Sequence, residues 1–159
     1  MTTEAFTERI IALEPRLYRV SAGILGQPSD QEDAVQSALE RAWRQLSSLR
    51  DEAAFESWVV RILINESRTI LRKKKWAVPM AEVPDFPAPP QDADPDLYRF
   101  FTGLSDKLRP VMTLFYVEGY EIPEIAYLLH LPRGTVKSRL ARGREAMRQA
   151  RTQWKEDEE

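Results

Sequence analysis

The stretch EIPEIAYLLHLPRGTVKSRL, residues 121–140, contains two apolar patterns of helical spacing on either side of a short break. The first pattern has apolar residues three and four positions apart, at Ile122, Ile125, Leu128 and Leu129. The second continues beyond the quoted stretch, at Val136, Leu140, Gly143 and Met147. Residues 131–134 hold a proline and a glycine, which interrupt helices. The stretch therefore predicts a helix-turn-helix, with Thr135 capping or beginning the second helix and the small Ala126 at the helix crossing.

The second helix of this motif has a polar, mostly basic outer face. On a helical wheel that face carries Lys137, Ser138, Ala141, Arg142 and Glu145, with Arg139 on its flank. A helix in the major groove needs such a face, because some side chains must reach base edges while nearby cations meet phosphates. The pattern favours DNA binding, although an ordinary helical hairpin with a charged exterior has the same periodicity. His130 falls in the turn, and we expect it to adopt a left-handed backbone rather than to bind a ligand.

The net charge of −2 conceals two basic segments in an otherwise acidic chain. Residues 57–75 hold six basic residues and one acidic residue, and residues 132–155 hold eight and one. A single segment of this kind is equally consistent with a solvated helix face. Two such segments, each closing a separate helical block, favour a polyanionic partner.

Composition excludes several classes of function. The chain has 159 residues, 43% hydrophobic and 30% charged, and no apolar run approaches the length of a membrane span. Its first residues, with acids and arginines among the apolar positions, do not resemble a signal peptide. There is no cysteine and one histidine, and we find no phosphate-cradling glycine loop or nucleophile–base pair. We therefore expect no catalytic residue, no metal site and no cofactor.

The N-terminal part of the chain predicts three helices. The first buries a face that consists of Phe6, Ile10, Leu13, Leu17 and Ile24. Gly26, Pro28 and Ser29 end that pattern, and Asp30 is expected to cap the second helix. The second helix is expected to bury Val35, Leu39, Ala42, Trp43 and Leu46. After the loop 47–54, the third helix runs from about Phe55 to Lys75.

The third helix combines an apolar arc with a basic side. The arc consists of Val59, Leu63, Ile64, Ile70 and Leu71. The other side carries Arg61, Asn65, Arg68, Thr69 and Arg72, with Trp58 at its edge. An asparagine among three arginines fits a base contact surrounded by phosphate contacts. A plain solvated face fits the pattern equally well.

Residues 76–95 differ in character from the helical blocks around them. They contain six of the eleven prolines and several acids, which predicts an extended acidic linker. A second helical block follows from about Asp96, and no stretch alternates in the way that a strand requires. The predicted fold is all-α, with two small helical domains, 1–75 and 96–159, joined by the linker 76–95. The C-terminal domain holds the helix-turn-helix.

Both blocks resemble one known family. The segment from Leu104 to Arg148, and GTVKSRLARGREAMR within it above all, resembles the C-terminal domain of extracytoplasmic-function sigma factors of bacterial RNA polymerase. The segment DQEDAVQSALERAW resembles the polymerase-binding helix of that family. The segment FESWVVRILINESRTILRKKK resembles the helix that reads the downstream promoter element. Both domains occur in the order that the family has, so the resemblance covers nearly the whole chain.

The resemblance implies three sets of functional residues. The minus-thirty-five element would be contacted by Arg133, Thr135, Lys137, Ser138, Arg139 and Arg142. The minus-ten element would be contacted by Trp58, Arg61, Asn65, Arg68 and Arg72, with the loop 47–54 receiving a base flipped out of the opened strand. Core polymerase would be bound by Asp33, Gln36, Val35, Leu39 and Glu40. The linker would pass through a polymerase channel near the active site.

These implications define an expected function and two alternatives. We expect a non-enzymatic sigma factor whose partners are bacterial RNA polymerase core enzyme, promoter DNA and an anti-sigma protein, with no membrane as a partner. It would work in the cytoplasm at the nucleoid, or be held at the membrane through the anti-sigma protein. One alternative is a stand-alone helix-turn-helix regulator that binds duplex DNA. The other is a sigma-mimicking adaptor that binds an anti-sigma protein and never contacts a promoter.

Overall fold

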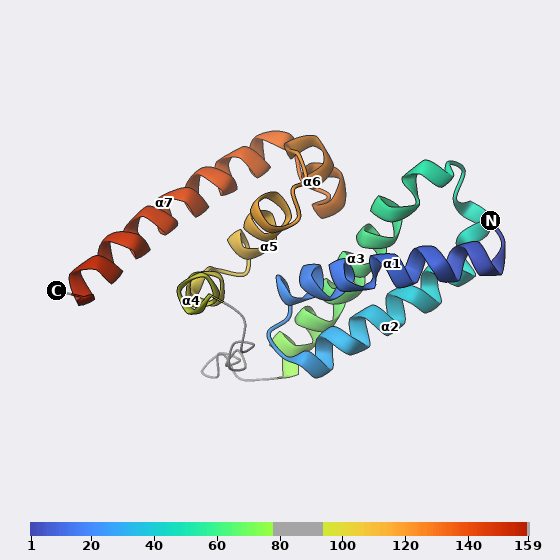
Figure 1. Cartoon of the computed structure of the whole chain (residues 1–159), viewed down its shortest axis with the longest axis horizontal. Coiled ribbons are helices and arrows are strands. Elements are labelled where there is room, and N and C mark those ends of the chain that lie inside the picture. Colours follow the sequence, from blue (N-terminus) through green and yellow to red (C-terminus); the bar gives the residue numbers. More distant parts are fainter. Residues whose placement is uncertain (78–93, 159) are drawn as a thin grey trace. The chain divides into compact units, whose positions relative to one another are not determined.

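The computed structural model describes residues 1–77 and 94–158 (Figure 1). The chain divides into two compact units, Met1–Asp85 and Phe86–Glu159, which we describe one at a time. Within the described residues every regular element is a helix and none is a strand. The prediction of an all-α fold is therefore confirmed.

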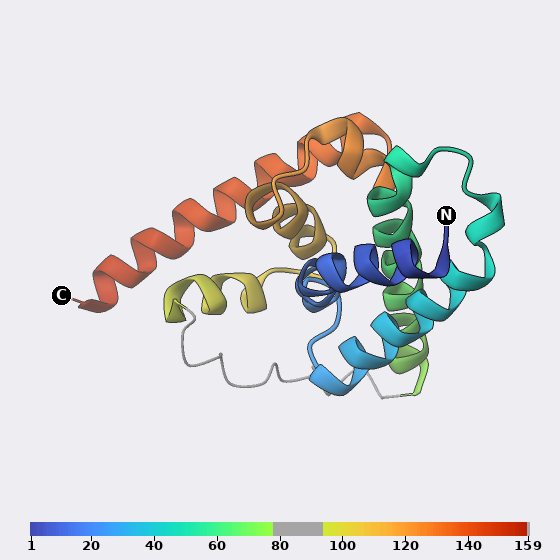
Figure 2. The same ribbon diagram turned by 45° about the vertical axis from the view of Figure 1, so that its right-hand side comes forward.

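The N-terminal unit is a bundle of three helices. They are α1 (Thr3–Ala22), α2 (Pro28–Arg44) and α3 (Phe55–Ala77). The short 3₁₀ turns η1 (Leu46–Ser48) and η2 (Glu52–Ala54) connect α2 to α3. The three helices pack against one another (Figure 2). Their shared core includes Leu17, Leu25, Val35, Phe55 and Leu63, each no more than 2% exposed.

The second helix starts earlier than predicted. It begins at Pro28, with Gln27 as the residue before it, so the prediction that Asp30 caps the helix is wrong. Proline suits the first helical position because its missing N–H would have no intrahelical partner there. Asp30 lies in the first turn, where its carboxylate pairs with Lys74 of α3.

The buried face of α2 also differs from the predicted one. It consists of Ala34, Val35, Ala38 and Ala42. Trp43, predicted to be buried, is 48% exposed, and its ring meets Phe6 edge-on at 5.1 Å between centroids. Leu39 and Leu46 are only half-buried. Alanines leave room for close helix packing, so the largest side chain of α2 lies at the edge of the core.

The C-terminal unit contains α4 (Pro95–Gly103), α5 (Leu108–Met112), the π-helical turn η3 (Thr113–Val117), α6 (Ile122–Leu129) and α7 (Arg133–Glu158). Its core is formed mainly by α5, α6 and the first half of α7. The fully buried side chains there include Val111, Met112, Ile125, Val136 and Leu140. Ile125, Val136 and Leu140 belong to the apolar patterns that predict the helix-turn-helix.

Arg109 is an ionic residue inside the C-terminal unit. It is 5% exposed, and its guanidinium donates to the carbonyl oxygens of Phe101 at 2.9 Å and Leu104 at 2.6 Å. A third N–H group donates to the Asp106 carboxylate at 3.2 Å. The two carbonyls lie at the end of α4, where the last carbonyls lack the usual helical partner, and that of Phe101 also accepts from the Leu104 N–H at 3.3 Å. Arg109 therefore fixes the turn between α4 and α5.

Most of the predicted linker, 76–95, lies outside the described residues. At its two ends the structure extends the helices beyond the predicted limits. Trp76 and Ala77 belong to the last turn of α3, and Pro95 is the first residue of α4. The Asp94 side chain accepts hydrogen bonds from the backbone N–H groups of Asp96 and Leu97 and thereby caps α4.

Candidate nucleic-acid interface

The turn of the helix-turn-helix contains His130 in a left-handed conformation. Its backbone angles are φ 57° and ψ 49°, and among the described residues it is the one non-glycine residue with positive φ. The His130 N–H donates to the Tyr127 carbonyl at 3.3 Å, and the Leu131 N–H donates to the Ala126 carbonyl at 2.9 Å. This pair of bonds usually forms around glycine, which has no side chain to clash. The left-handed conformation expected for His130 is confirmed.

The recognition helix begins before the predicted position. Arg133 and Gly134, predicted to lie in the break, are the first residues of α7. Thr135 is the third residue of the helix and is half-buried, so the prediction that it caps or begins the helix is wrong. Pro132 precedes α7 directly, and the Val136 N–H donates to its carbonyl at 3.2 Å. The first turn of α7 therefore includes one basic residue, Arg133, that was expected in the break.

One side of α7 is buried and the other is exposed. Val136 and Leu140 are 0% and 1% exposed and face the rest of the unit. Lys137, Ser138, Ala141 and Arg142 are exposed, and we call these four residues the α7 face. Arg133 is exposed at the start of the helix, and Arg139 is half-buried on the flank. The structure therefore groups the predicted recognition residues on one outer surface.

The negative charge beside the α7 face is paired. Glu145 accepts two hydrogen bonds from the guanidinium of Arg148, at 2.7 and 3.1 Å. The Ser138 hydroxyl donates to the carbonyl of Thr135 at 3.1 Å and leaves its oxygen as an acceptor. Since Glu145 is neutralised locally, the α7 face has a basic character that suits a phosphate backbone.

Gly143 brings α7 close to α5. A β-carbon built at this glycine would lie 2.3 Å from the Met112 sulfur and 2.7 Å from Met112 Cγ. Met112 is 0% exposed, so a side chain at position 143 would have to displace it within the core. The sequence predicted that the helices approach most closely at Ala126, which is half-buried. In the structure, the position that has no room for a side chain is Gly143. The orientation of the α7 face therefore depends on this residue.

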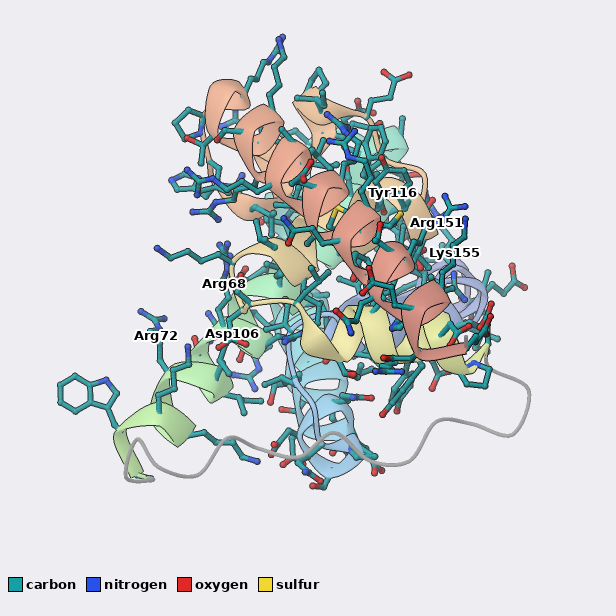
Figure 3. All side chains as sticks on the ribbon, turned by 90° about the vertical axis from the view of Figure 1, so that its left-hand side faces the viewer. Arg68, Arg72, Asp106, Tyr116, Arg151 and Lys155 are labelled. Carbon is teal, nitrogen blue, oxygen red and sulfur yellow. The ribbon has the colours of Figure 1, made fainter. Side chains whose placement is uncertain are left out.

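The polar side of α3 presents the second set of predicted residues. Asn65 and Arg72 are exposed, whereas Trp58, Arg61 and Arg68 are half-buried. These five residues, here called the α3 stripe, follow one another at intervals of three or four and so share one side of the helix. Arg68 and Arg72 extend from the same side of α3 (Figure 3). The opposite side, with Val59, Leu63 and Ile64, is completely buried.

The short elements before α3 are attached to α1. Arg9 donates to the carbonyl of Glu52 at 3.0 Å, and the N-terminal amine lies 3.3 Å from the Glu52 carboxylate. Asp51 accepts a hydrogen bond from the Ala53 N–H at 3.0 Å and so caps η2. Residues 47, 48, 50 and 51 are nevertheless exposed. The loop expected to receive a flipped base is thus anchored at one end and accessible at its centre.

The predicted polymerase-docking residues occupy the outer surface of α2. Asp33, Gln36 and Glu40 are exposed, and Glu40 lies 3.4 Å from Arg44 on the same helix. Leu39 is half-buried, while Val35 is 2% exposed and lies inside the bundle. Val35 can therefore support this surface from beneath but presents no area to a partner. We call Asp33, Gln36, Leu39 and Glu40 the α2 face.

Two ion pairs join α2 to α3. Arg41 Nε lies 2.7 Å from Glu66 Oε1, and the second pair joins Asp30 to Lys74. The acidic partner is the more buried one in both pairs, with 17% of the Glu66 side chain and 15% of the Asp30 side chain exposed. The α2 face and the α3 stripe therefore belong to one tightly connected pair of helices. The sequence analysis identified neither pair.

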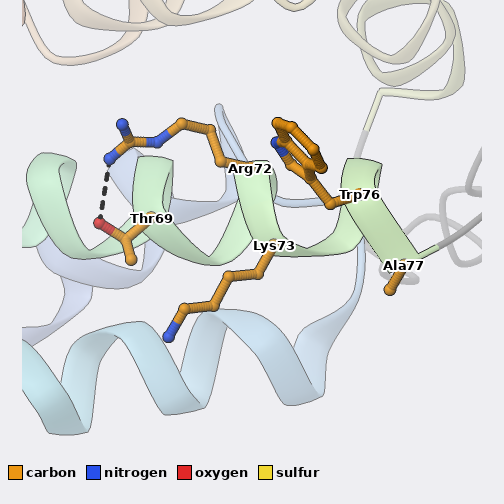
Figure 4. Close-up of a pocket in the computed structure, with 5 residues that line it drawn as sticks. All are labelled: Thr69, Arg72, Lys73, Trp76 and Ala77. Atoms are coloured by element: carbon orange, nitrogen blue, oxygen red, sulfur yellow. Dashed lines mark hydrogen bonds between the residues drawn. The ribbon is translucent and has the colours of Figure 1, made fainter.

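Trp76 is an exposed residue close to the α3 stripe that was not predicted to belong to α3. It was assigned to the linker, but it lies in α3 four positions after Arg72, and 91% of it is exposed. The sequence does place Trp76 four positions after Arg72, as a shared helix face requires. The predicted linker began at residue 76, so Trp76 was not counted as part of the helix. A shallow groove beside it is lined by Thr69, Arg72, Lys73, Trp76 and Ala77 (Figure 4).

The described part of the chain holds neither a cluster of metal ligands nor a membrane-spanning helix. No group of three or more histidine, cysteine, aspartate or glutamate residues in residues 1–77 and 94–158 could hold a metal ion. In the same ranges, no helix has both the length and the apolar character needed to cross a bilayer.

Family models match both units. Residues 10–77 match the model of sigma-70 region 2, and residues 96–147 match that of sigma-70 region 4. The first match contains α2, α3 and most of α1. The second contains α4 to α6 and the part of α7 that carries the α7 face. The two matches together leave out the N-terminal turns of α1, the middle of the chain and the last turns of α7.

Curated relatives and a solved structure also belong to the sigma factors. The chain is 27% identical to the ECF RNA polymerase sigma factor SigW of Bacillus subtilis (strain 168), over 91% of this chain and 88% of the relative. It is 30% identical to the ECF RNA polymerase sigma-E factor of Escherichia coli (strain K12), over 74% and 72%. The fold resembles that of the sigma factor RpoE in complex with the anti-sigma factor NepR from Bartonella quintana. That likeness has a TM-score of 0.78 and 24% identity, over 94% of this chain and 98% of the other.

Proposed function

Because the chain belongs to the ECF sigma factors of the sigma-70 family, we propose that its two units divide promoter recognition between the α3 stripe and the α7 face. As a sigma factor, the protein binds core RNA polymerase and promoter DNA and directs the start of transcription. We assign 1–75 to core binding and the minus-ten element, 76–95 to a linker, and 96–159 to the minus-thirty-five element. The observation that carries this proposal is a basic helix face on each unit, opposite a completely buried side.

The α3 stripe suits an opened DNA strand. Asn65 is exposed and offers both a donor and an acceptor, so we assign base recognition to it. Arg61, Arg68 and Arg72 surround it with positive charge and are assigned to phosphates. Trp58 is half-buried at the start of the stripe, next to Phe55 at 6.2 Å between ring centroids. The exposed centre of the loop 47–54 is the assigned receptor for a flipped base.

The α7 face suits the major groove of duplex DNA. Arg142 is exposed and long enough to form a two-point contact with guanine, and Lys137 and Ser138 lie beside it. Arg133 and Thr135 lie in the first turn of α7, where free backbone N–H groups and a basic side chain can hold one phosphate together. Arg139, half-buried on the flank, is assigned to the backbone as well.

The α2 face is the proposed docking surface for core polymerase. Asp33 and Glu40 give it negative charge, and Leu39 adds a partly exposed apolar contact. Such a surface suits a basic helical partner. We also propose an anti-sigma protein as a further partner, since the RpoE structure that the fold resembles contains the anti-sigma factor NepR. We place the protein in the cytoplasm and assign no catalytic group to it.

Transcription in vitro with core polymerase tests this proposal. Adding the full chain to core enzyme should produce transcripts from discrete start sites that core enzyme alone does not use. Asp33→Arg reverses a charge at the N-terminal end of the α2 face, so we expect at least a tenfold weaker complex with core polymerase and a matching loss of transcript. Glu8→Arg makes the same change at an exposed position of α1 and should behave as the wild type.

Two outcomes would contradict this assignment. If Asp33→Arg and Glu8→Arg bound core polymerase equally well, the α2 face would not be the docking surface. If the chain bound duplex DNA tightly and selectively but never associated with core enzyme, a stand-alone regulator would explain the α7 face better. Capture of an anti-sigma protein without any promoter-specific transcript would instead favour the sigma-mimicking adaptor.

Replacing Arg142 and replacing Arg133 should have different effects, the first on base recognition and the second on phosphate binding. Arg142→Ala should remove a base contact that is worth about 1–3 kcal/mol and relax the preference at one or two base pairs of the upstream element. Arg133→Ala should weaken binding to all sequences and lower the salt dependence by about one phosphate contact. A base-by-base promoter scan with the holoenzyme measures both effects. An Arg142→Ala profile identical to that of the wild type would refute the assigned role of the α7 face.

A further inference from the structure

Trp76 continues the exposed side of α3 beyond the α3 stripe. It follows Thr69, Arg72 and Lys73 at intervals of seven, four and three positions, so these residues share one face of the helix. The Thr69 hydroxyl donates to the Asn65 carbonyl at 2.9 Å, and Arg72 reaches back toward Thr69 at 3.5 Å (Figure 4). The face that begins at Asn65 therefore extends one helical turn past Arg72 and ends at an indole ring.

The indole ring is unusually accessible. Trp76 is 91% exposed, whereas Trp43, the other tryptophan with a large exposed area, is 48% exposed and meets Phe6 edge-on. Tryptophan carries one of the largest apolar surfaces of any side chain, which proteins usually cover. An indole left open on the last turn of a helix therefore has a full ring face available to a ligand.

The surroundings of the ring indicate what that ligand is. The groove beside Trp76 has a volume of about 460 Å³, and Arg72 and Lys73 line it with positive charge. Lys74, the next cation, is already paired with Asp30, so its charge is partly neutralised. An aromatic face next to two cations suits a nucleotide, because the base stacks on the ring while the phosphate meets the charge. A purely apolar partner would leave both cations unmatched.

We propose that Trp76 is a stacking site for an unpaired DNA base, with Arg72 and Lys73 holding the adjacent phosphates. This inference rests on the proposed function, since it extends the strand that the α3 stripe binds by one further nucleotide. Stacking tolerates any base because every base has a flat face. The site therefore adds affinity for the opened strand without adding sequence preference, in contrast to Asn65.

Binding of two short single strands to the full-length chain tests the proposal. One labelled strand is a thymidine oligonucleotide, and the other is an abasic strand with the same number of phosphates. Trp76→Ala should weaken binding of the thymidine strand about 5- to 150-fold, the range that base–aromatic stacking supports, and leave the abasic strand unaffected. Arg72→Ala should weaken both strands equally, because it meets phosphates. Trp76→Phe should retain part of the preference.

Controls separate stacking from other effects. Ile11→Ala removes an exposed apolar side chain from α1, 63% exposed, and should change neither affinity. The thymidine strand should also quench the tryptophan fluorescence of the wild type more than that of Trp76→Phe. Since Trp76 packs against little else, circular dichroism of the variants should match that of the wild type.

Each remaining outcome counts against the proposal. Equal affinity of the wild-type chain for the two strands, or no binding of either strand, would overturn it. So would a Trp76→Ala variant that bound DNA normally but lost affinity for core polymerase, since Trp76 would then be a protein contact. Core-dependent transcription is scored separately. A chain that initiates at promoters while Trp76→Ala binds DNA normally would refute the stacking site and leave the sigma function intact.

Discussion

Replacing Gly143 with leucine is expected to unfold the C-terminal unit and abolish recognition of the upstream promoter element. Even a β-carbon would lie 2.3 Å from the sulfur of Met112, and leucine adds three carbons more. Overpacking by a methylene or two costs about 1–3 kcal/mol, and a unit this small has little stability to lose. We expect a loss of at least about 3 kcal/mol. In thermal unfolding of the full chain, the transition of the C-terminal unit should vanish and that of the N-terminal unit should remain.

Gly134→Leu is the matched control for this prediction. Gly134 lies on the same helix, and no atom approaches within 4 Å of a β-carbon built there. Its replacement should change the free energy of unfolding by less than about 1 kcal/mol, since leucine also has the higher helix propensity. The contact with Met112 can be tested further by combining Gly143→Ala with Met112→Ala, which should cost less than the sum of the two changes. Equal damage from Gly143→Leu and Gly134→Leu would refute the steric explanation.

The second large effect is expected from Arg109→Ala. This change leaves the carbonyls of Phe101 and Leu104 without their side-chain donor in a region where Arg109 itself is 5% exposed. The Leu104 carbonyl then loses its donor, whereas the Phe101 carbonyl keeps the Leu104 N–H at 3.3 Å. A buried polar group that loses its partner costs about 1–3 kcal/mol, so we expect the free energy of unfolding to fall by about that amount. Urea unfolding of the full chain, followed by circular dichroism, measures this loss.

Two further variants determine which property of Arg109 matters. Arg109→Lys keeps the charge but replaces the planar guanidinium with a single ammonium group, so it should recover only part of the lost stability. Lys107→Ala removes a positive charge from an exposed side chain two residues earlier and should change stability by less than about 0.5 kcal/mol. Full recovery by lysine would show that charge alone, rather than the three-point contact, stabilises the turn.

The helix-turn-helix was predictable because its signals are local. The apolar spacing from Ile122 to Met147 specifies two helices, and the break between them leaves His130 as the residue that must turn the chain. The starting residue of each helix was less predictable. Pro28 and Arg133 begin helices two or three residues before the expected positions. Proline acts both as a helix breaker and as a first helical residue, so the sequence pattern alone does not separate the two roles.

The arrangement of side chains between helices was not predictable in the same way. Trp43 was expected in the core because tryptophan is apolar, but the alanines of α2 set the distance to its neighbours and leave the indole at the edge. No pattern in the sequence pointed to Arg109, and its burial depends on carbonyls five and eight positions away. Gly143 gave no sign that Met112 would face it. Each of these depends on contacts between segments, which apolar periodicity does not encode.

The candidate site followed the same division. The exposure of Lys137, Arg142, Asn65 and Arg72 follows from helix geometry once the buried side of each helix is known. Val35 was predicted both to be buried and to contact polymerase, and its burial leaves it no surface for the second role. The exposure of Trp76 does not follow from helix geometry alone, since it depends on where α3 ends. Which bases and phosphates these residues contact remains a prediction.

The two ion pairs between α2 and α3 bear on where transcription starts. α2 and α3 pack through their buried faces, and Asp30–Lys74 and Arg41–Glu66 join them at two separated points, so α3 has little freedom to slide or rotate against α2. If polymerase holds α2 and the promoter is read by α3, this rigid pair sets a constant length between the enzyme's active centre and the recognised bases. The helix pair then fixes the distance from the recognised bases to the first transcribed nucleotide. Variation in the position of that nucleotide must arise in the DNA or the polymerase.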